Sequence, residues 1–114
     1  MKTAFTLLAI TVLPAAAADI SGSWKLDGHL ENVQIHRVCT LQKIDHKLSG
    51  KCKNATDEVV LAGEVDGNNV AWKYDVTYDG AKLTLTFNGT LESATVRGSI
   101  ETMGAKGDFT ATKQ

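Results

Sequence analysis

The chain has 114 residues, of which 12 are Lys or Arg and 13 are Asp or Glu, so its formal net charge at pH 7 is −1. This length is enough for a single domain. A nearly neutral chain lacks the basic surface that attracts nucleic acids and anionic membranes, so we expect no nucleic-acid partner.

The first 18 residues have the pattern of an export signal. Lys2 supplies a basic start, residues 4–13 are apolar apart from two threonines, and Ala16 and Ala18 fit the A-x-A cleavage rule. The alternative, a retained anchor, is disfavoured because a membrane-spanning helix needs about 20 apolar residues. We predict a signal peptide over 1–18, a β-barrel domain over 19–114, no membrane span after cleavage, and a periplasmic or secreted location.

Strand and turn signals alternate roughly every ten residues along the rest of the chain, with almost no helical periodicity. Asp79-Gly80 suits a two-residue hairpin turn, and residues 28–32 and 103–106 are predicted to be longer loops. We predict eight strands, at Gly22–Asp27, Val33–Gln42, Lys47–Lys53, Glu58–Asp66, Asn69–Tyr78, Ala81–Leu91, Ala94–Thr102 and Gly107–Lys113.

The turns fix how neighbouring strands pair, since each turn sets which residues face each other. We use a two-residue turn at Asp79-Gly80, another at Glu92-Ser93, and a loop over Asp66–Asn69. The resulting pairs are Trp72–Phe87, Tyr74–Leu85, Phe87–Gly98, Gly63–Trp72 and Leu61–Tyr74. These registers keep the apolar side chains on one face of the sheet and the polar ones on the other.

Cys39 and Cys52 lie on either side of a predicted turn at Asp45-His46. Counting outward from a two-residue loop puts them directly opposite each other, with Cα atoms about 4.5 Å apart, which a disulfide can bridge. In an exported protein we expect this disulfide to form and to stabilise the fold by about 3 kcal/mol. The alternative, a redox or metal pair, lacks the C-x-x-C spacing and a nearby His.

A meander of eight strands with one apolar face has two unpaired edge strands unless the sheet closes on itself. Eight strands is the number at which an up-and-down barrel closes around an interior filled by side chains or by a ligand. We therefore predict an all-β fold, a single antiparallel up-and-down meander of about eight strands closed into a small barrel. A flattened sandwich and a five-stranded OB-type barrel are the alternatives.

Gly22-Ser23-Trp24 stands at the head of the first predicted strand. A Gly-x-Trp in this place, followed by short hairpins, resembles the calycin barrels, which comprise the lipocalin and avidin families. The resemblance extends to the strand that carries Trp72 and Tyr74, and so touches most of residues 19–114. It implies an eight-stranded barrel in which Trp24 plugs one end while the other end admits a ligand.

Strand direction places a second group of inward residues at the end opposite Trp24. An apolar, aromatic cup with a few polar groups near its rim is typical of a small-molecule pocket. The predicted ligand-binding residues are Arg37, Trp72, Tyr74, Tyr78, Glu31 and Asp57. The alternative is that the aromatic residues simply fill the core. A buried Arg37 needs a partner, which is a carboxylate of Glu31 or Asp57, an aromatic ring, or an anionic group of a ligand.

We expect no cofactor and no metal site, because the three histidines are scattered and nucleotide-binding and catalytic motifs are absent. The leading hypothesis is an exported, non-enzymatic module that binds a small apolar or amphipathic molecule. One alternative is a cell-envelope interaction or inhibitor protein with a filled barrel, acting through its loops or an exposed strand edge. The other is a cofactor-free isomerase, lyase or cyclase, with Asp57 or Glu31 as base and Tyr78 as acid.

Overall fold

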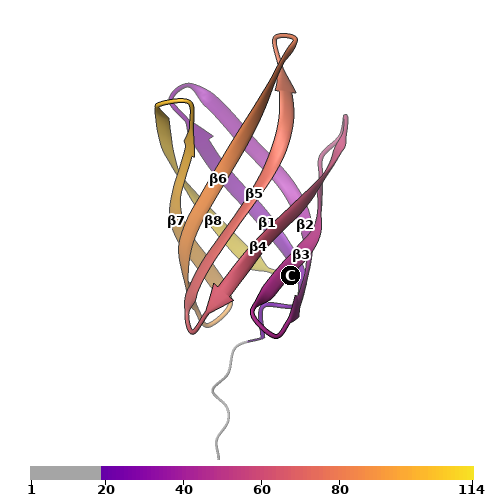
Figure 1. Cartoon of the computed structure of the whole chain (residues 1–114), viewed down its shortest axis with the longest axis vertical. Coiled ribbons are helices and arrows are strands. Elements are labelled where there is room, and N and C mark those ends of the chain that lie inside the picture. Colours follow the sequence, from indigo (N-terminus) through magenta and orange to yellow (C-terminus); the bar gives the residue numbers. More distant parts are fainter. Residues whose placement is uncertain (1–18) are drawn as a thin grey trace, which may run out of the picture.

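The computed structural model describes residues 19–114, and the predicted signal peptide lies outside the described residues. Eight antiparallel strands pair in chain order, and β1 also pairs with β8, so the sheet closes into a barrel (Figure 1). The strands are β1 (Gly22–Leu30), β2 (Val33–Ile44), β3 (Lys47–Lys53), β4 (Glu58–Asp66), β5 (Asn69–Tyr78), β6 (Ala81–Glu92), β7 (Thr95–Thr102) and β8 (Ala105–Lys113). The predicted all-β fold, a closed up-and-down meander, is confirmed.

Two predicted loops are wrong, because the strands beside them are longer than expected. β1 continues to Leu30, so the loop at 28–32 shrinks to the turn Glu31-Asn32. β8 begins at Ala105, which leaves Met103-Gly104 as the other turn. Glu31 and Met103 have φ values of 53° and 43°. This left-handed conformation matches the twist of a two-residue hairpin turn. Residues such as Glu and Met seldom adopt it, so the pairing of the flanking strands must hold it in place.

One predicted register is also wrong. The β6–β7 turn is Ser93-Ala94 instead of Glu92-Ser93, so Phe87 pairs with Ile100 and Gly89 pairs with Gly98. A shift of two residues leaves every side chain on its predicted face. The paired glycines make room for an aromatic ring, since a Cβ at Gly89 would stand 3.0 Å from the ring of Phe109. The predicted β5–β6 pairs and the Gly63–Trp72 pair are confirmed.

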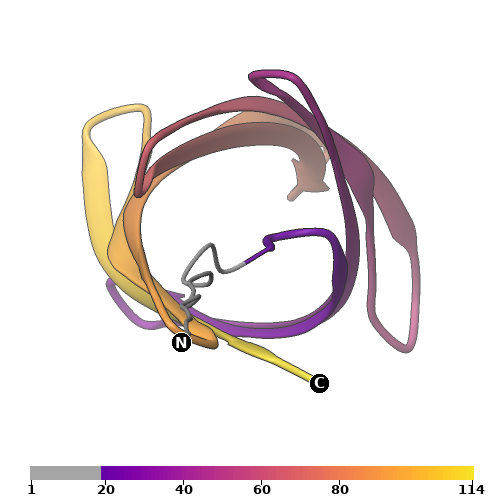
Figure 2. The ribbon, with the colours of Figure 1, turned by 90° about the horizontal axis from the view of Figure 1, so that it is seen from below.

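The lower end of the barrel, where β1 begins, is filled with side chains. Trp72 stacks on Phe87 with ring centroids 5.2 Å apart, and Phe109 packs edge-on against both rings. Below them Trp24 is buried, and its indole nitrogen donates a hydrogen bond to the carbonyl of Ile20 at 2.8 Å. Seen from below, residues 19–21 turn inward at the opening just before β1 (Figure 2). The lower half is therefore a packed core.

The Cys39–Cys52 disulfide joins β2 to β3, as predicted. The two residues face each other in the register set by the Asp45-His46 turn, and both are buried. The covalent link fixes a local hairpin within the core, where Cys39 pairs with Trp24 of β1. It also holds β3 beside the stretch of β2 that carries Arg37, two residues before Cys39.

Candidate functional site

The upper end of the barrel is open because its hairpins differ in length and diverge. It is formed by the turns at 31–32, 54–57, 79–80 and 103–104. The β4–β5 pairing stops at Ala62–Lys73, so the predicted Leu61–Tyr74 pair does not form. Above that point β4 and β5 separate, and the β5–β6 hairpin projects beyond its neighbours (Figure 1). The sheet therefore opens sideways at this end.

A cavity of about 470 Å³ occupies this open end. Such a volume lies within the range of small-molecule pockets. Apolar side chains make much of its wall: Val33, Ile35, Val76, Leu83, Leu85 and Ala105. The polar groups of the wall come from β2, from the 54–57 loop, from β5 and from β7. An apolar wall with a few polar groups suits an amphipathic molecule.

Arg37 is the buried charge of this cavity. Its side chain is only 8% exposed, and Nη1 lies 2.9 Å from Oδ1 of Asp57. The guanidinium carbon also lies 5.4 Å from the ring centroid of Tyr74. Asn54 holds the loop in place, since its side-chain oxygen accepts hydrogen bonds from the backbone amides of Thr56 and Asp57, each 2.9 Å long. The sequence left open which groups would pair with Arg37. In the structure they are the carboxylate of Asp57 and the ring of Tyr74.

Two hydroxyl groups in the wall of the cavity lack a protein partner. Tyr74 Oη and Thr102 Oγ1 are buried, and within residues 19–114 neither makes a hydrogen bond of good geometry, although the Arg37 guanidinium lies near enough to the Tyr74 hydroxyl to act on its pKa. Burial raises the pKa of Tyr74 to about 12, and the nearby positive charge of Arg37 only partly opposes this shift. Tyr74 therefore stays a neutral phenol. A buried, unpaired hydroxyl costs stability, and a ligand atom in the cavity is a natural partner for it.

The six predicted ligand-binding residues do not all lie in the same place. Arg37, Tyr74, Asp57, Glu31 and Tyr78 all line the cavity. Glu31 is exposed at the rim, and Tyr78 is 55% exposed near the tip of the β5–β6 hairpin. The sixth, Trp72, does not line the cavity. Its ring lies in the aromatic cluster, where its indole nitrogen is buried without a partner.

Several residues of the cavity were not among the predicted site residues. Asn54 and Thr56 come from a loop whose shape no sequence pattern revealed. Ile35 and Leu83 line the wall, and strand alternation gives the signal for both, because they share the parity of Arg37 and Leu85. Alternation applied to every strand would therefore have found the apolar wall, but not the polar loop.

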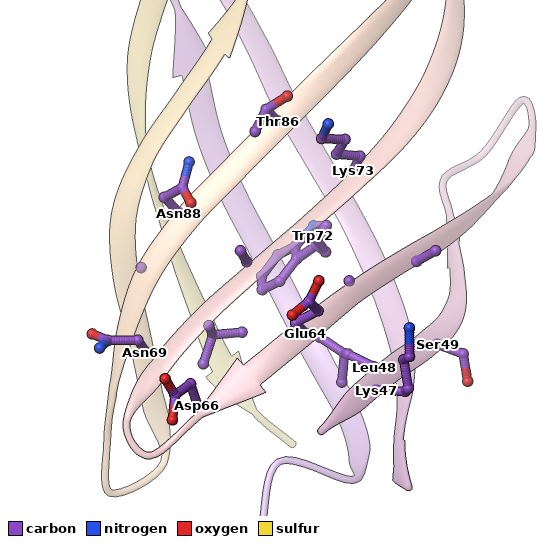
Figure 3. A pocket seen from close by; sticks show the side chains of 15 residues that line it. Lys47, Leu48, Ser49, Glu64, Asp66, Asn69, Trp72, Lys73, Thr86 and Asn88 are labelled. Carbon is purple, nitrogen blue, oxygen red and sulfur yellow. The ribbon is translucent and has the colours of Figure 1, made fainter. Parts of the chain in front are cut away.

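A larger groove of about 920 Å³ runs along the outer surface of β3 to β6 (Figure 3). Its polar side chains, among them Lys47, Glu64 and Lys73, are exposed to solvent. Small outward residues, such as Ser49 and Ala62, leave the space that forms it. Trp72, the predicted site residue that is absent from the upper cavity, also lines this groove. The charged side chains of the groove are exposed and none is buried like Arg37, so the groove is the weaker candidate. The upper cavity is the candidate.

Within residues 19–114, no three His, Cys, Asp or Glu side chains lie close enough to hold a metal ion together. The same residues contain no helix that is long and apolar enough to cross a bilayer. No protein-family model matches the sequence, and no curated protein matches it at a significant level.

Proposed function

We propose that the protein is an exported, non-enzymatic module that holds a small apolar or amphipathic molecule in its upper cavity. The observation that carries the proposal is an open cavity of about 470 Å³ with the buried, unpaired hydroxyl of Tyr74 in its wall. Thr102 Oγ1, a second buried hydroxyl without a partner, lies in the wall of the same cavity, where a ligand atom can bond to both groups. The resemblance to the calycin barrels, in which the end opposite the Trp plug admits a ligand, supports the same reading.

The chemistry of the cavity favours a molecule with an apolar body and a head group that accepts hydrogen bonds. Tyr74 and Thr102 offer hydroxyl donors, and Arg37 keeps further N–H groups besides the Nη1 that pairs with Asp57. The partial exposure of Asp57, at 49%, leaves room for a ligand oxygen to compete for the guanidinium. We propose a carboxylate or sulfonate head at Arg37 and Tyr74, with the apolar part against the valine and leucine wall.

We also propose that residues 1–18 form a cleaved signal peptide, and that the mature protein works in the periplasm or outside the cell. The Cys39–Cys52 disulfide supports this location, because such bonds persist in oxidising compartments. The catalytic alternative has less support. Asp57 is half exposed and paired with Arg37, so it lacks the buried, unpaired setting of a general base.

The direct test is native mass spectrometry of the protein purified from periplasm without denaturant. We expect an extra mass that leaves on denaturation, and it identifies the ligand. Binding of anilinonaphthalene sulfonate, a fluorescent amphipathic anion, gives an independent measurement. We expect one dye per chain, bound at least about tenfold more weakly by Arg37→Met. Arg97→Met is the matched control, because Arg97 is exposed on β7 far from the cavity wall.

Tyr74→Phe separates binding from folding. It removes only the unpaired hydroxyl, so we expect the free energy of unfolding to rise by about 1 kcal/mol while dye affinity falls several-fold. A loss of affinity together with a gain in stability is the signature of a group kept for a ligand. Equal dye binding by wild type, Arg37→Met and Tyr74→Phe would falsify the proposed site.

A further inference from the structure

The charges on the outer surface of the barrel are sorted by side. Every second side chain of a strand points outward. On β1, β2 and β3 the outward charged side chains are one carboxylate, Asp27, and four lysines: Lys25, Lys47, Lys51 and Lys53. On β4 to β8 they are four cations and seven carboxylates: Lys73, Lys82, Arg97 and Lys106 against Glu58, Glu64, Asp66, Asp75, Glu92, Glu101 and Asp108. The formal net charge of −1 conceals this separation. We call the outer surface of β1–β3 the basic face.

The lysines of the basic face are not neutralised by ion pairs. Lys25 and Lys51 have no acidic cross-strand neighbour. The other two lysines stand opposite Glu58 and Glu64 of β4. None of the four takes part in an ion pair within residues 19–114. Even when both glutamates are counted with the face, its net charge stays positive.

The same region carries exposed aliphatic side chains. Five large apolar side chains are exposed within residues 19–114, and three of them lie on β2 or on the adjoining β4: Val38, Ile44 and Val60. Each of the three is the direct cross-strand neighbour of at least one lysine of the basic face. Val38 is 42% exposed and Val60 is 70% exposed. Val38 and Lys51 also line a groove of about 320 Å³ on this surface. Apolar and cationic groups therefore alternate across the face.

The composition of the basic face favours a lipid surface over a protein partner. Protein interfaces are enriched in Trp, Tyr and Arg and are poor in Lys. The outward residues of β1, β2 and β3 include no Trp, Tyr or Arg. Lysine ammonium groups attract anionic phospholipids, and the lysine stems and short aliphatic side chains pack among the lipid headgroups.

We propose that the basic face binds the surface of a bilayer that contains anionic phospholipids. The lysines contact the lipid phosphates, and Val38 and Val60 contact the apolar part of the headgroup region. Strand β6 stands opposite β2 in the closed ring, so the barrel lies on its side with the β5–β6 hairpin on the far side (Figure 2). This goes beyond the proposed cavity function, because it adds a membrane partner that a different surface recognises. It brings the cavity close to the place where amphipathic molecules gather.

The test measures the sedimentation of the protein, purified from periplasm, with phospholipid vesicles. One set contains equal parts of phosphatidylglycerol and phosphatidylcholine, and the other contains phosphatidylcholine alone. We expect binding to the anionic set at low salt, and its loss in about 1 M NaCl, where the screening length falls to about 3 Å. Lys25→Gln, Lys51→Gln and Lys53→Gln together weaken binding about hundredfold, since each lysine near an anionic surface contributes about fivefold.

A matched control changes the net charge equally on the acidic side of the barrel. Lys73→Gln, Lys82→Gln and Lys106→Gln together also remove three positive charges, and we expect this variant to keep most of its affinity for the anionic vesicles. Val60→Ser tests the apolar contribution. It weakens binding to the vesicles several-fold and leaves any binding to dextran sulfate, a polyanion without lipid, unchanged.

Three outcomes would overturn the proposal. One is an equal loss of affinity in the control variant, and another is equal binding to phosphatidylcholine alone. The third is binding to dextran sulfate or polyglutamate as tight as to the anionic vesicles, which would mean that the partner is an acidic macromolecule. None of the three substituted lysines of the basic face lines the upper cavity, so that variant keeps the ligand mass in native mass spectrometry. Failure of the membrane proposal and failure of the small-molecule proposal are therefore distinguishable.

Discussion

The two ends of this barrel are built from the same strands, yet they differ in how completely those strands are used. At the lower end neighbouring strands stay paired and aromatic rings fill the interior, with the Trp24 indole bonded to Ile20. At the upper end the β4–β5 pairing stops early and leaves a cavity with an unpaired Tyr74 hydroxyl. The comparison teaches that the extent of pairing between neighbouring strands separates the packed end of this barrel from the open one, because β4 and β5 both continue beyond their last pair.

The largest expected effect is at the packed end. Phe87 is fully buried and contacts the rings of Trp72, Tyr74 and Phe109 at centroid distances of 5.1 to 5.2 Å. We expect Phe87→Ala to lower the free energy of unfolding by about 4 kcal/mol in urea titrations. Leu83→Ala, in the half-open cavity wall, is the matched control and should cost much less. Similar losses at both positions would contradict the contrast between the ends.

The next largest effect concerns the covalent link between β2 and β3. Replacing Cys39 and Cys52 together by Ala removes the closure of a short loop, with a sequence separation of 13. We expect a loss of about 3 kcal/mol in the free energy of unfolding. Reductant should produce a similar loss in the wild type and none in the double variant. If reductant destabilised both equally, the effect would not come from the disulfide.

Alkaline unfolding sharpens the comparison on the open side. The pKa of Tyr74 is raised by burial from 10.0 to about 12, so the folded state disfavours the phenolate. The neutral Tyr74 phenol therefore contributes fully to the free energy of unfolding below pH 10, and this contribution is lost as the pH rises from 10 towards 12. The loss amounts to at most about 2.7 kcal/mol. Urea titrations across this range should show the decline, and Tyr74→Phe should lack that part of it.

The smallest effect is expected at the other unpaired hydroxyl. Thr102→Val replaces a buried, unpartnered Oγ1 by a methyl group of similar size in the cavity wall. We expect the free energy of unfolding to rise by less than about 1 kcal/mol, because the lost group makes no hydrogen bond. Thermal unfolding measures the difference. A clear destabilisation would mean that this hydroxyl has a partner in the folded protein.

The sequence was sufficient to predict the closed barrel, the disulfide and five of the residues around the cavity. The alternation of apolar and polar residues and the positions of turn residues are local signals. They predict the number of strands and the pairing of Cys39 with Cys52. They also place Arg37 and Tyr74 inside, with Asp57 near the rim. These inferences needed only the period of two along each strand and the direction of the chain.

The rest depended on features that no local pattern encodes. The β6–β7 turn is Ser93-Ala94 instead of Glu92-Ser93, and it pairs Gly98 with Gly89, whose missing side chain leaves space for Phe109, a residue of another strand. The place where β4 leaves β5 depends on the curvature of the whole barrel, so the Leu61–Tyr74 pair was predicted and is absent. The site therefore lies where the regular register ends.

The contact between β1 and β8 has a consequence for how the chain folds. Trp24 pairs with Lys113, and the backbone amide of Gln114 donates to the carbonyl of Ser23, so the ring closes between the two ends of the domain. Every other strand pair is joined by a short turn and forms early, whereas this pair must wait for a search over nearly the whole chain. The disulfide lies within a single hairpin and does nothing to shorten that search. We therefore expect ring closure to be the slowest step of folding.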